Sequence, residues 1–305
     1  MFTNGLDTMA YKSGFIALIG APNVGKSTLM NALLGQKLSI VSSRPQTTRN
    51  RIVGVKHVPG GQFVFLDTPG ILEPKGLLNQ ALVQAALKTI GDVNLVLLLI
   101  EPFAAQAPIP EGLAQKLIRL KPPVFLIINK IDLIDKRDLL PLINRMATLF
   151  SFQEIIPLSA LKKEGLAILE QKIFEVLPEG PPYFPEEMVT DLSERFLVGE
   201  IIREKIFRLT SREVPYAVAV TVESFKERQD KPMIHIQATI HVERDSQKGI
   251  LIGKGGGMLK TIAQQARQDM ERLLGTKVFL EVWVRVEKNW SRDSRQIRRF
   301  GYEEA

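Results

Sequence analysis

One short segment near the N-terminus constrains the fold more than any other feature of the chain. Residues 20–27 read Gly-Ala-Pro-Asn-Val-Gly-Lys-Ser and match the phosphate-binding pattern G-x-x-x-x-G-K-[ST]. The segment follows the apolar run from Phe15 to Ile19 and precedes a stretch of helical pattern, and the motif requires both neighbours. It therefore predicts a strand, a phosphate-binding loop and a helix, in that order.

The residue types of this loop suit phosphate groups. Glycines allow backbone N–H groups to face the phosphates, and the helix N-terminus adds a partial positive charge. We expect Lys26 to reach the β- and γ-phosphates and Ser27 to bind Mg²⁺. A glycine-rich turn without function is the alternative, but such a match arises by chance in only about one chain in a hundred. The predicted phosphate-binding residues are Gly20, Ala21, Pro22, Asn23, Val24, Gly25, Lys26, Ser27 and Thr28, with Gly70 from a later loop.

Strand-like apolar runs alternate with helix-like stretches through the first half of the chain. After the first run, they span residues 63–66, 95–100, 124–128 and 154–158. Runs that are apolar at consecutive positions are typical of strands buried on both faces, as in a mostly parallel sheet with helices on both faces. Residues 51–56 predict an edge strand that reaches the next strand through a Pro-Gly-Gly turn. These features predict an α/β domain.

A proline-rich segment marks the expected boundary between two domains. A chain of 305 residues is long for one hydrophobic core, and residues 178–185 contain four prolines, which cannot continue a helix. We predict a first domain at 1–178, a linker at 179–192 and a second domain at 193–305. The second domain has an α+β pattern with a helix at 193–209, strands at 216–226 and 233–243, a short helix, a glycine loop, a helix at 258–275, a strand at 277–286 and a basic helix at 290–300.

Composition and charge narrow the classes of partner and site. The chain has no cysteine and three histidines, which excludes disulfides and thiolate metal sites, so we expect any metal to be held by oxygens. The longest apolar stretch, residues 95–100, is far shorter than the ~20 residues of a membrane-spanning helix. No signal-peptide pattern opens the chain, so we expect a soluble, cytosolic protein. Residues 244–299 carry thirteen Lys and Arg against six Asp and Glu, which favours a polyanion as partner over a merely solvated surface.

Three further motifs follow predicted strands and complete a nucleotide site: residues 67–70, residues 129–132 and the pair Ser159-Ala160. In Asp67-Thr-Pro-Gly70, the carboxylate can hold the Mg²⁺ shell and the Gly70 N–H can sense the γ-phosphate. The Asp132 carboxylate in Asn129-Lys-Ile-Asp can accept hydrogen bonds from guanine N1–H and N2–H₂, where adenine has no donor, and this favours GTP over ATP. The predicted guanine-binding residues are Asn129, Lys130, Ile131, Asp132, Ser159 and Ala160.

A second glycine loop lies in the basic half of the chain. Residues 252–256 read Ile-Gly-Lys-Gly-Gly and supply a G-x-x-G loop between two predicted helices, which is typical of a KH domain. A structural turn and a second nucleotide loop are the alternatives, and the absence of Ser or Thr after the lysine disfavours the latter. We expect contacts to RNA from Ile252, Gly253, Lys254, Gly255 and Gly256, with Ile250 and Ile262 lining a neighbouring groove for bases. Of the two tryptophans, we expect Trp283 to pack in the core.

Taken together, the motifs at residues 20–27, 67–70, 129–132 and 159–160 resemble those of Ras-like GTPases of the translation-factor class. The segment from Ser43 to Arg51, Ser-Arg-Pro-Gln-Thr-Thr-Arg-Asn-Arg, resembles the first switch region of the Era family, and the second half resembles the Era KH region. The resemblance implies an α/β P-loop GTPase domain followed by an α+β type II KH domain. It also implies a switch I of Gln46, Thr47, Thr48, Arg49 and Asn50, and a switch II of Asp67, Thr68, Pro69, Gly70 and Ile71.

The same resemblance implies how the site works. Mg²⁺ would be held by Ser27, Asp67 and one switch threonine, Thr48 in preference to Thr47. Ile71 stands where other GTPases carry a water-orienting glutamine, so no side chain is assigned as catalytic and we expect slow intrinsic turnover. The Era family further implies binding of the 3′-terminal region of small-subunit ribosomal RNA during subunit maturation, a monomer, and a weak peripheral association with the cytoplasmic membrane.

Two other functions remain open at this point. One is a GTPase that acts on another RNA or on translation, which the KH pattern disfavours. The other is a constitutive RNA-binding module whose nucleotide domain only supports the fold, which Lys26, Ser27, Asp67 and Asp132 disfavour. RNA binding that ignored the nucleotide would favour the latter.

A pair of substitutions tests this assignment. Lys26→Ala should abolish nucleotide binding because the lysine is assigned to the phosphates, whereas Ile71→Ala should leave binding largely intact. Titration of each variant with a fluorescent GTP analogue measures both effects. Loss of binding in Ile71→Ala would show that the second switch is misplaced.

Overall fold

The computed structural model describes residues 10–42, 44, 47–70, 78, 92–103, 121–211, 213–228 and 232–302. The chain forms two compact units. The N-terminal unit consists of Met1–Ser39, Arg51–Thr68 and Ala86–Asp191, and the C-terminal unit consists of Ile40–Asn50, Pro69–Ala85 and Leu192–Ala305. Two short segments from the first half of the sequence are therefore clustered with the C-terminal unit.

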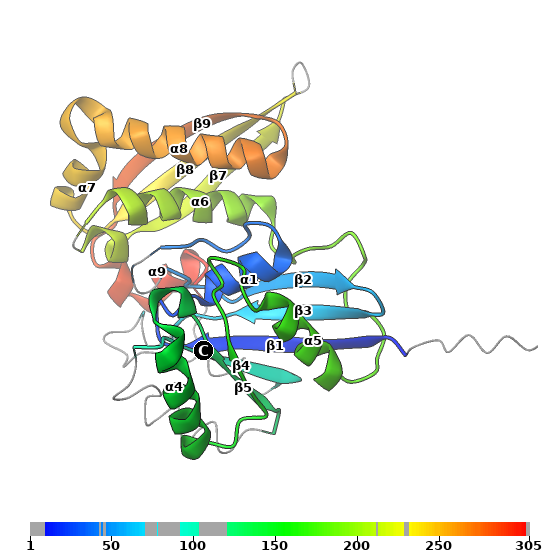
Figure 1. The fold of residues 1–305 in the computed structure, drawn as a ribbon. Helices are drawn as coiled ribbons and strands as arrows, with labels where there is room; N and C mark the ends of the chain where they lie inside the picture. Colours follow the sequence, from blue (N-terminus) through cyan, green and yellow to red (C-terminus); the bar gives the residue numbers. More distant parts are fainter. Residues whose placement is uncertain are drawn as a thin grey trace, which may run out of the picture. The chain divides into compact units, whose positions relative to one another are not determined.

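The N-terminal unit is built on a six-stranded sheet with the order β2-β3-β1-β4-β5-β6 (Figure 1). All neighbouring pairs are parallel except β2 and β3, which form the predicted hairpin at the sheet edge. Every residue of β3, β4 and β5 is buried, which explains why these strands read as continuous apolar runs. The strands are β1 (Lys12–Gly20), β2 (Ile52–Val58), β3 (Gly61–Asp67), β4 (Leu95–Ile100), β5 (Val124–Ile128) and β6 (Glu154–Pro157).

Helices of this unit begin close to the ends of strands. Helix α1 (Lys26–Leu34) starts within the predicted phosphate loop, and α4 (Lys136–Leu149) is capped by Asp135, whose side chain accepts a hydrogen bond from the Arg137 N–H. The 3₁₀ turn η2 (Ile131–Leu133) follows β5, and α5 (Leu166–Val176) follows β6. The predicted α/β class of this unit is confirmed.

The C-terminal unit has a three-stranded sheet with the order β7-β8-β9, in which β7 and β8 are antiparallel and β8 and β9 are parallel. A parallel pair needs a crossover, and two helices joined by the second glycine loop supply it. The elements are α6 (Glu194–Leu209), η3 (Val214–Ala217), β7 (Ala219–Glu227), β8 (Met233–Val242), α7 (Asp245–Ile252), η4 (Lys254–Gly256), α8 (Gly257–Leu274), β9 (Lys277–Val286), η5 (Trp290–Arg292) and α9 (Ser294–Arg299). The predicted α+β order is confirmed.

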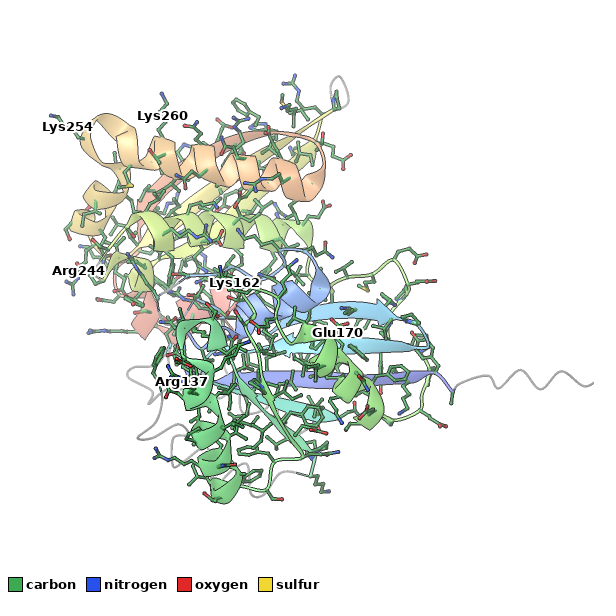
Figure 2. All side chains as sticks on the ribbon, viewed as in Figure 1. Arg137, Lys162, Glu170, Arg244, Lys254 and Lys260 are labelled. Carbon is green, nitrogen blue, oxygen red and sulfur yellow. The ribbon has the colours of Figure 1, made fainter. Side chains whose placement is uncertain are left out.

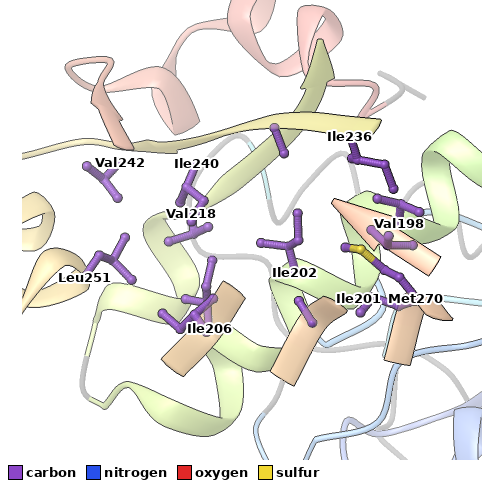
Figure 3. Close-up of a cluster of buried hydrophobic side chains, with 14 of the residues drawn as sticks. Val198, Ile201, Ile202, Ile206, Val218, Ile236, Ile240, Val242, Leu251 and Met270 are labelled. Carbon is purple, nitrogen blue, oxygen red and sulfur yellow. The ribbon is translucent and has the colours of Figure 1, made fainter. Parts of the chain in front are cut away.

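One face of this sheet forms the core of the unit with helices α6 and α8. Side chains from the helices, such as Ile202 and Met270, meet side chains of β8, such as Ile236 and Ile240 (Figure 3). All four are fully buried. The hydrophobic cluster therefore holds the helices on the sheet and fixes the position of the glycine loop between α7 and α8.

The structure differs from the sequence-based prediction in two places of this half: the basic helix starts later, and Trp283 is not in the core. Residues 290–300 form a 3₁₀ turn and a separate short helix, because the Asp293 side chain accepts hydrogen bonds from the Arg295 and Gln296 N–H groups and starts a new helix there. Trp283 is 47% exposed on β9, whereas Trp290 is fully buried and its indole N–H donates to the Ala217 carbonyl over 2.9 Å. The strand places Trp283 on the sheet face opposite the core.

The core predicts the effect of one truncation. Ile202→Ala should lower the free energy of unfolding of the C-terminal unit by about 2–5 kcal/mol, because the cavity is fully enclosed. Ile250→Ala is the matched control, since Ile250 is 46% exposed and its truncation should leave stability nearly unchanged. Chemical denaturation of both variants measures the difference. Equal destabilisation by the two substitutions would contradict the described core.

Candidate nucleotide and RNA sites

The loop between β1 and α1 has a backbone that only glycine can adopt at two positions. Gly20 and Gly25 have φ values of 144° and 99°. A Cβ at Gly20 would lie 2.4 Å from the Leu99 carbonyl oxygen, and one at Gly25 would lie 2.2 Å from Asn129 Nδ2. The conformation therefore excludes side chains at both ends of the loop.

Lys26 is folded back over this loop. Its Nζ donates hydrogen bonds to the carbonyl oxygens of Gly20 and Ala21, at 3.2 and 2.9 Å. Burial lowers the pKa of Lys26 to about 8, and the neighbouring Asp67 carboxylate partly opposes this shift. Phosphate oxygens would offer the ammonium group a stronger partner than two carbonyls do.

Oxygen atoms suited to a hard cation gather beside the loop. Ser27 Oγ donates to Asp67 Oδ2 over 2.6 Å, and Ser39 Oγ donates to the same oxygen over 2.8 Å. Hydroxyl and carboxylate oxygens are the ligands that Mg²⁺ prefers, so this set fits the predicted ion. Ser39 was missed by the sequence analysis, because no motif marks it. Asn31 positions it by accepting hydrogen bonds from the Leu38 and Ser39 N–H groups.

The predicted guanine-binding residues lie together at the carboxyl ends of β5 and β6. Asn129 braces two loops, since its Nδ2 donates to the Val24 carbonyl over 2.7 Å and its Oδ1 accepts from the Ala160 N–H over 3.0 Å. Ser159 Oγ donates to Asp132 Oδ1 over 2.5 Å, which orients the carboxylate. Lys130 forms an ion pair with Glu101, and Ile131 begins η2. The sequence analysis did not identify Glu101.

The predicted switch segments are placed less completely. Gln46 and Ile71 lie outside the described residues, while Thr68 Oγ1 donates to the Leu18 carbonyl over 2.8 Å at the end of β3. Thr47 to Asn50 cluster with the C-terminal unit, as do Pro69 and Gly70. The structure therefore does not place Thr48 in the same compact unit as Ser27 and Asp67.

Arg49 is a fully buried member of the C-terminal unit. Its Nη1 donates to the Val218 carbonyl over 2.6 Å and to Tyr302 Oη over 3.1 Å. Its Nη2 donates to the carbonyls of Tyr216 and Pro215, at 2.9 and 3.2 Å. The guanidinium carbon also lies within 6.0 Å of the ring centroids of Phe207, Trp290 and Tyr302. The Arg49 side chain thus holds the end of the predicted switch I segment in the C-terminal unit. Burial lowers the pKa of the Arg49 guanidinium.

Helix α6 holds the rest of the segment through buried charged residues. Arg203 donates to the Thr47 carbonyl and forms an ion pair with Glu200. Glu204 accepts a hydrogen bond from the Val41 N–H over 3.2 Å and forms an ion pair with Arg208 over 3.0 Å. Arg203 and Glu204 are at most 1% exposed. From the sequence, this stretch was interpreted only as the start of the second domain. The burial of its charged residues was not predicted, because charged residues on a helix usually face water.

The second glycine loop joins α7 to α8. Gly253, Gly255 and Gly256 have φ values of 69°, 59° and 77°, a backbone conformation that residues with side chains rarely adopt. Lys254 is exposed, and Figure 2 shows it and Lys260 pointing away from the unit. The predicted role of Ile262 is wrong, because Ile262 is fully buried in the core.

The pKa of Lys26 predicts a proton change on ligand binding. A phosphate ligand favours the charged form and raises the pKa of Lys26, so binding near pH 8.5 should take up a fraction of a proton. The nucleotide affinity should fall as the pH rises above about 8. Calorimetry of GDP binding in buffers of different ionisation enthalpy measures the uptake. The uptake should persist unchanged in Lys136→Ala, since Lys136 is exposed at the start of α4, and should disappear near pH 6.5. No uptake at pH 8.5 would contradict the assignment.

Comparisons with known protein families match both halves of the chain. A family model described as a 50S ribosome-binding GTPase matches residues 15–130, and a KH domain model matches residues 213–291. GTPase Era of Geotalea uraniireducens is 54% identical over 293 residues, which are 96% of this chain and 98% of the relative. GTPase Era of Syntrophus aciditrophicus is 51% identical over 304 residues, which are 99% of both chains.

Solved structures of Era proteins share the fold. One is a variant Era of Aquifex aeolicus bound to GDP and AlF₄⁻, with 43% identity, a TM-score of 0.92 and coverage of 95% of this chain and 99% of that one. Another is Era in complex with MgGDPNP and nucleotides 1506–1542 of 16S ribosomal RNA, with 43% identity, a TM-score of 0.93 and coverage of 96% and 99%. The phosphate loop, the guanine-binding loops and the KH loop thus occur here in a chain that belongs to the Era family of GTPases.

Proposed function

We propose that this chain is a GTP-hydrolysing switch that binds the 3′-terminal region of small-subunit ribosomal RNA and assists maturation of the small subunit. Support comes from the phosphate and guanine loops in one unit and the KH loop in the other. The Era relative bound to part of 16S ribosomal RNA supports the choice of RNA. We further propose domains at 1–178 and 193–305 with a linker at 179–192, where residues 40–50 and 69–85 of the first range cluster with the C-terminal unit.

The nucleotide would be bound in the loop at residues 20–28, with its guanine at Asn129 and Asp132. Ser27, Asp67 and Thr48 would hold Mg²⁺, which supplies positive charge next to the β- and γ-phosphates when it is bound. The oxygen atoms of Ser27 and Asp67 already lie within hydrogen-bond distance of each other, at 2.6 Å. Lys26 would leave its two carbonyl partners for phosphate oxygens.

Hydrolysis would be slow without a partner. No side chain is assigned as catalytic, because Ile71 occupies the position of the glutamine that orients water in other GTPases. The attacking water would be placed by backbone groups or by a bound partner. Slow turnover suits a protein whose function depends on the lifetime of its GTP-bound state.

One observation carries the proposed switch function: the switch I residues cluster with the C-terminal unit and not with the unit that holds the phosphate loop. Residues Ile40–Asn50 leave the N-terminal unit after Ser39, lie in the C-terminal unit and return at Arg51. If Thr48 binds Mg²⁺ only beside a γ-phosphate, then the nucleotide acts on a segment that Arg49 and α6 hold. Binding of GTP and binding of RNA would be linked through this segment.

Location and assembly are proposed from the family resemblance alone. We propose a cytoplasmic monomer with a loose peripheral contact to the membrane. Among the described residues, no helix is long and apolar enough to cross a bilayer. Sedimentation with vesicles of anionic lipid tests the peripheral contact, and a protein that stays in the supernatant at low salt would contradict it.

The proposed function predicts RNA binding that depends on the nucleotide. A fragment of the 3′-terminal region of small-subunit ribosomal RNA should bind more tightly with a non-hydrolysable GTP analogue and Mg²⁺ than with GDP or without nucleotide. Typical couplings between two sites are about 5- to 150-fold. Fluorescence anisotropy of the labelled fragment measures all three affinities. Equal affinities would leave an RNA-binding protein whose GTPase domain serves another step.

Arg49→Ala should remove this dependence and leave both sites able to bind. The substitution frees the end of switch I, so the ratio between the RNA affinities with the GTP analogue and with GDP should approach one. Arg51→Ala is the control, because Arg51 lies only two residues after Arg49 but is exposed. An insertion of two glycines between Thr48 and Arg49 should have the same effect while the guanidinium keeps its partners. A normal ratio in both the substituted and the extended chain would show that the nucleotide signal takes another route.

A further inference from the structure

Strand β9 presents two large aromatic side chains to solvent. Phe279 is 53% exposed and Trp283 is 47% exposed. Side chains alternate along a strand, and Val278, Leu280 and Val282 lie on the face that packs against the core. The aromatic rings therefore lie on the opposite face of the sheet, which we call the outer face and define by Lys277, Phe279, Glu281, Trp283 and the residues paired with them.

The strand pairing sets the residues of the outer face in rows across the sheet. One row is Lys226, His235 and Phe279, and another is Thr221, Thr239 and Trp283. Between them lies a row of Ser224, Gln237 and Glu281. Each aromatic ring thus has hydrogen-bonding side chains beside it, which could contact the edges of a base that stacks on the ring.

The C-terminal segment, which includes Phe300, covers the end of this face at His241 and leaves the end at His235 open. His241 is 1% exposed, and its ring lies 4.6 Å from that of Phe300. His235 lies toward the other end, where its ring meets the edge of Phe279 at 5.1 Å. Among the described residues, the open part of the face reaches from Lys277 to Trp283.

The charges on this face favour an anionic ligand. Lys226, Lys277 and Arg285 are exposed cations on the outer face. Glu281 lies between the two rings, but its Oε2 accepts hydrogen bonds from His235 over 2.6 Å and from Gln237 over 3.0 Å. Glu223, at the bulge of β7, accepts a hydrogen bond from the Thr221 hydroxyl. Glu287, at the covered end of the face, lies 3.8 Å from His241 Nδ1. All three carboxylates contact neighbouring side chains, whereas Lys226, Lys277 and Arg285 are exposed to a ligand.

This pattern differs from a protein-binding patch. A large apolar patch for docking a protein is contiguous, whereas a polar row separates these two rings. Four residues of strand span about 13 Å, which is much more than the ~3.4 Å between stacked bases. Two rings at this distance suit an extended single strand, with one base on each ring and the intervening nucleotides above the polar row.

We propose that the outer face of the β7-β8-β9 sheet is a second surface for single-stranded RNA, on which Phe279 and Trp283 each stack against a base. The inference rests on the proposed function, since it takes RNA as the ligand. A KH loop clamps only about four nucleotides, so a longer RNA needs further surface. This face would hold the nucleotides that extend beyond the loop between α7 and α8.

The two tryptophans make the proposal directly testable. Trp290 is fully buried, so quenching of tryptophan fluorescence by RNA reports mainly on Trp283. The full chain is titrated with nested fragments of the 3′-terminal region of small-subunit ribosomal RNA, one of about 4 and one of about 12 nucleotides. The longer fragment should quench the fluorescence, and the shorter one should bind without quenching it.

Substitutions then separate this surface from the KH loop. Trp283→Thr and Phe279→Thr keep residues that suit a strand, and each should weaken binding of the longer fragment by roughly 5- to 100-fold. Neither should change binding of the shorter fragment. Leu273→Thr on α8 is the control, because Leu273 is 37% exposed and lies outside the sheet; it should leave both affinities unchanged. Thermal unfolding of each variant checks the fold.

Each contrary outcome has a clear meaning. If Trp283→Thr binds the longer fragment as tightly as the unsubstituted chain, the proposed surface is refuted while the KH site stands. If neither fragment binds the unsubstituted chain, the proposed function itself fails. A fluorescence change that follows protein concentration without RNA would assign the face to a second copy of the chain and overturn the proposal.

Discussion

The buried guanidinium of Arg49 is the interaction on which the organisation of this chain depends. A charge without contact to a carboxylate is stable in a core only where hydrogen bonds and rings surround it, and here three carbonyls, one hydroxyl and three aromatic rings do so. Withdrawal of the side chain would break these four hydrogen bonds. The end of the proposed switch I is therefore held in the C-terminal unit, and under the proposed function a nucleotide that moved Thr48 would act on this contact.

In the phosphate loop, by contrast, polar side chains have hydrogen-bond partners that a bound nucleotide and a cation would replace. Lys26 contacts two carbonyl oxygens, and Ser27 and Ser39 both donate to Asp67. A phosphate and a hard cation would offer all these groups stronger partners. The rigid parts of the site are the glycines, which exclude side chains, and Asn129, which joins the loops at Val24 and Ala160. A fixed frame that carries exchangeable polar groups is suited to binding and releasing a nucleotide.

Much of the fold could be predicted from the sequence because strong local signals mark it. Continuous apolar runs predicted β3, β4 and β5, and the glycine patterns located both loops. The C-terminal end was predicted less well, since the basic pattern of residues 290–300 did not reveal that Asp293 caps a new helix. Trp283 was expected in the core but is exposed, because a strand with apolar residues on both faces does not show which face is covered. Arg49 and Glu204 were not recognised as buried, since partners distant in the sequence, such as Tyr302 and Val41, create their environment.

The central claim is that the segment Ile40–Asn50, which contains the proposed switch I, folds as part of the C-terminal unit. Native-state hydrogen exchange of the Val41 amide tests this claim most directly, because Val41 lies in that segment. This N–H donates to Glu204 on α6. Destabilisation of the C-terminal core by Ile202→Ala should speed its exchange together with that of the β8 amides. A truncation in the core of the N-terminal unit, Ile127→Ala, should leave it unchanged. If the Val41 amide instead followed the N-terminal core and ignored Ile202→Ala, switch I would not belong to the C-terminal unit and the proposed link between nucleotide and RNA would lose its structural basis.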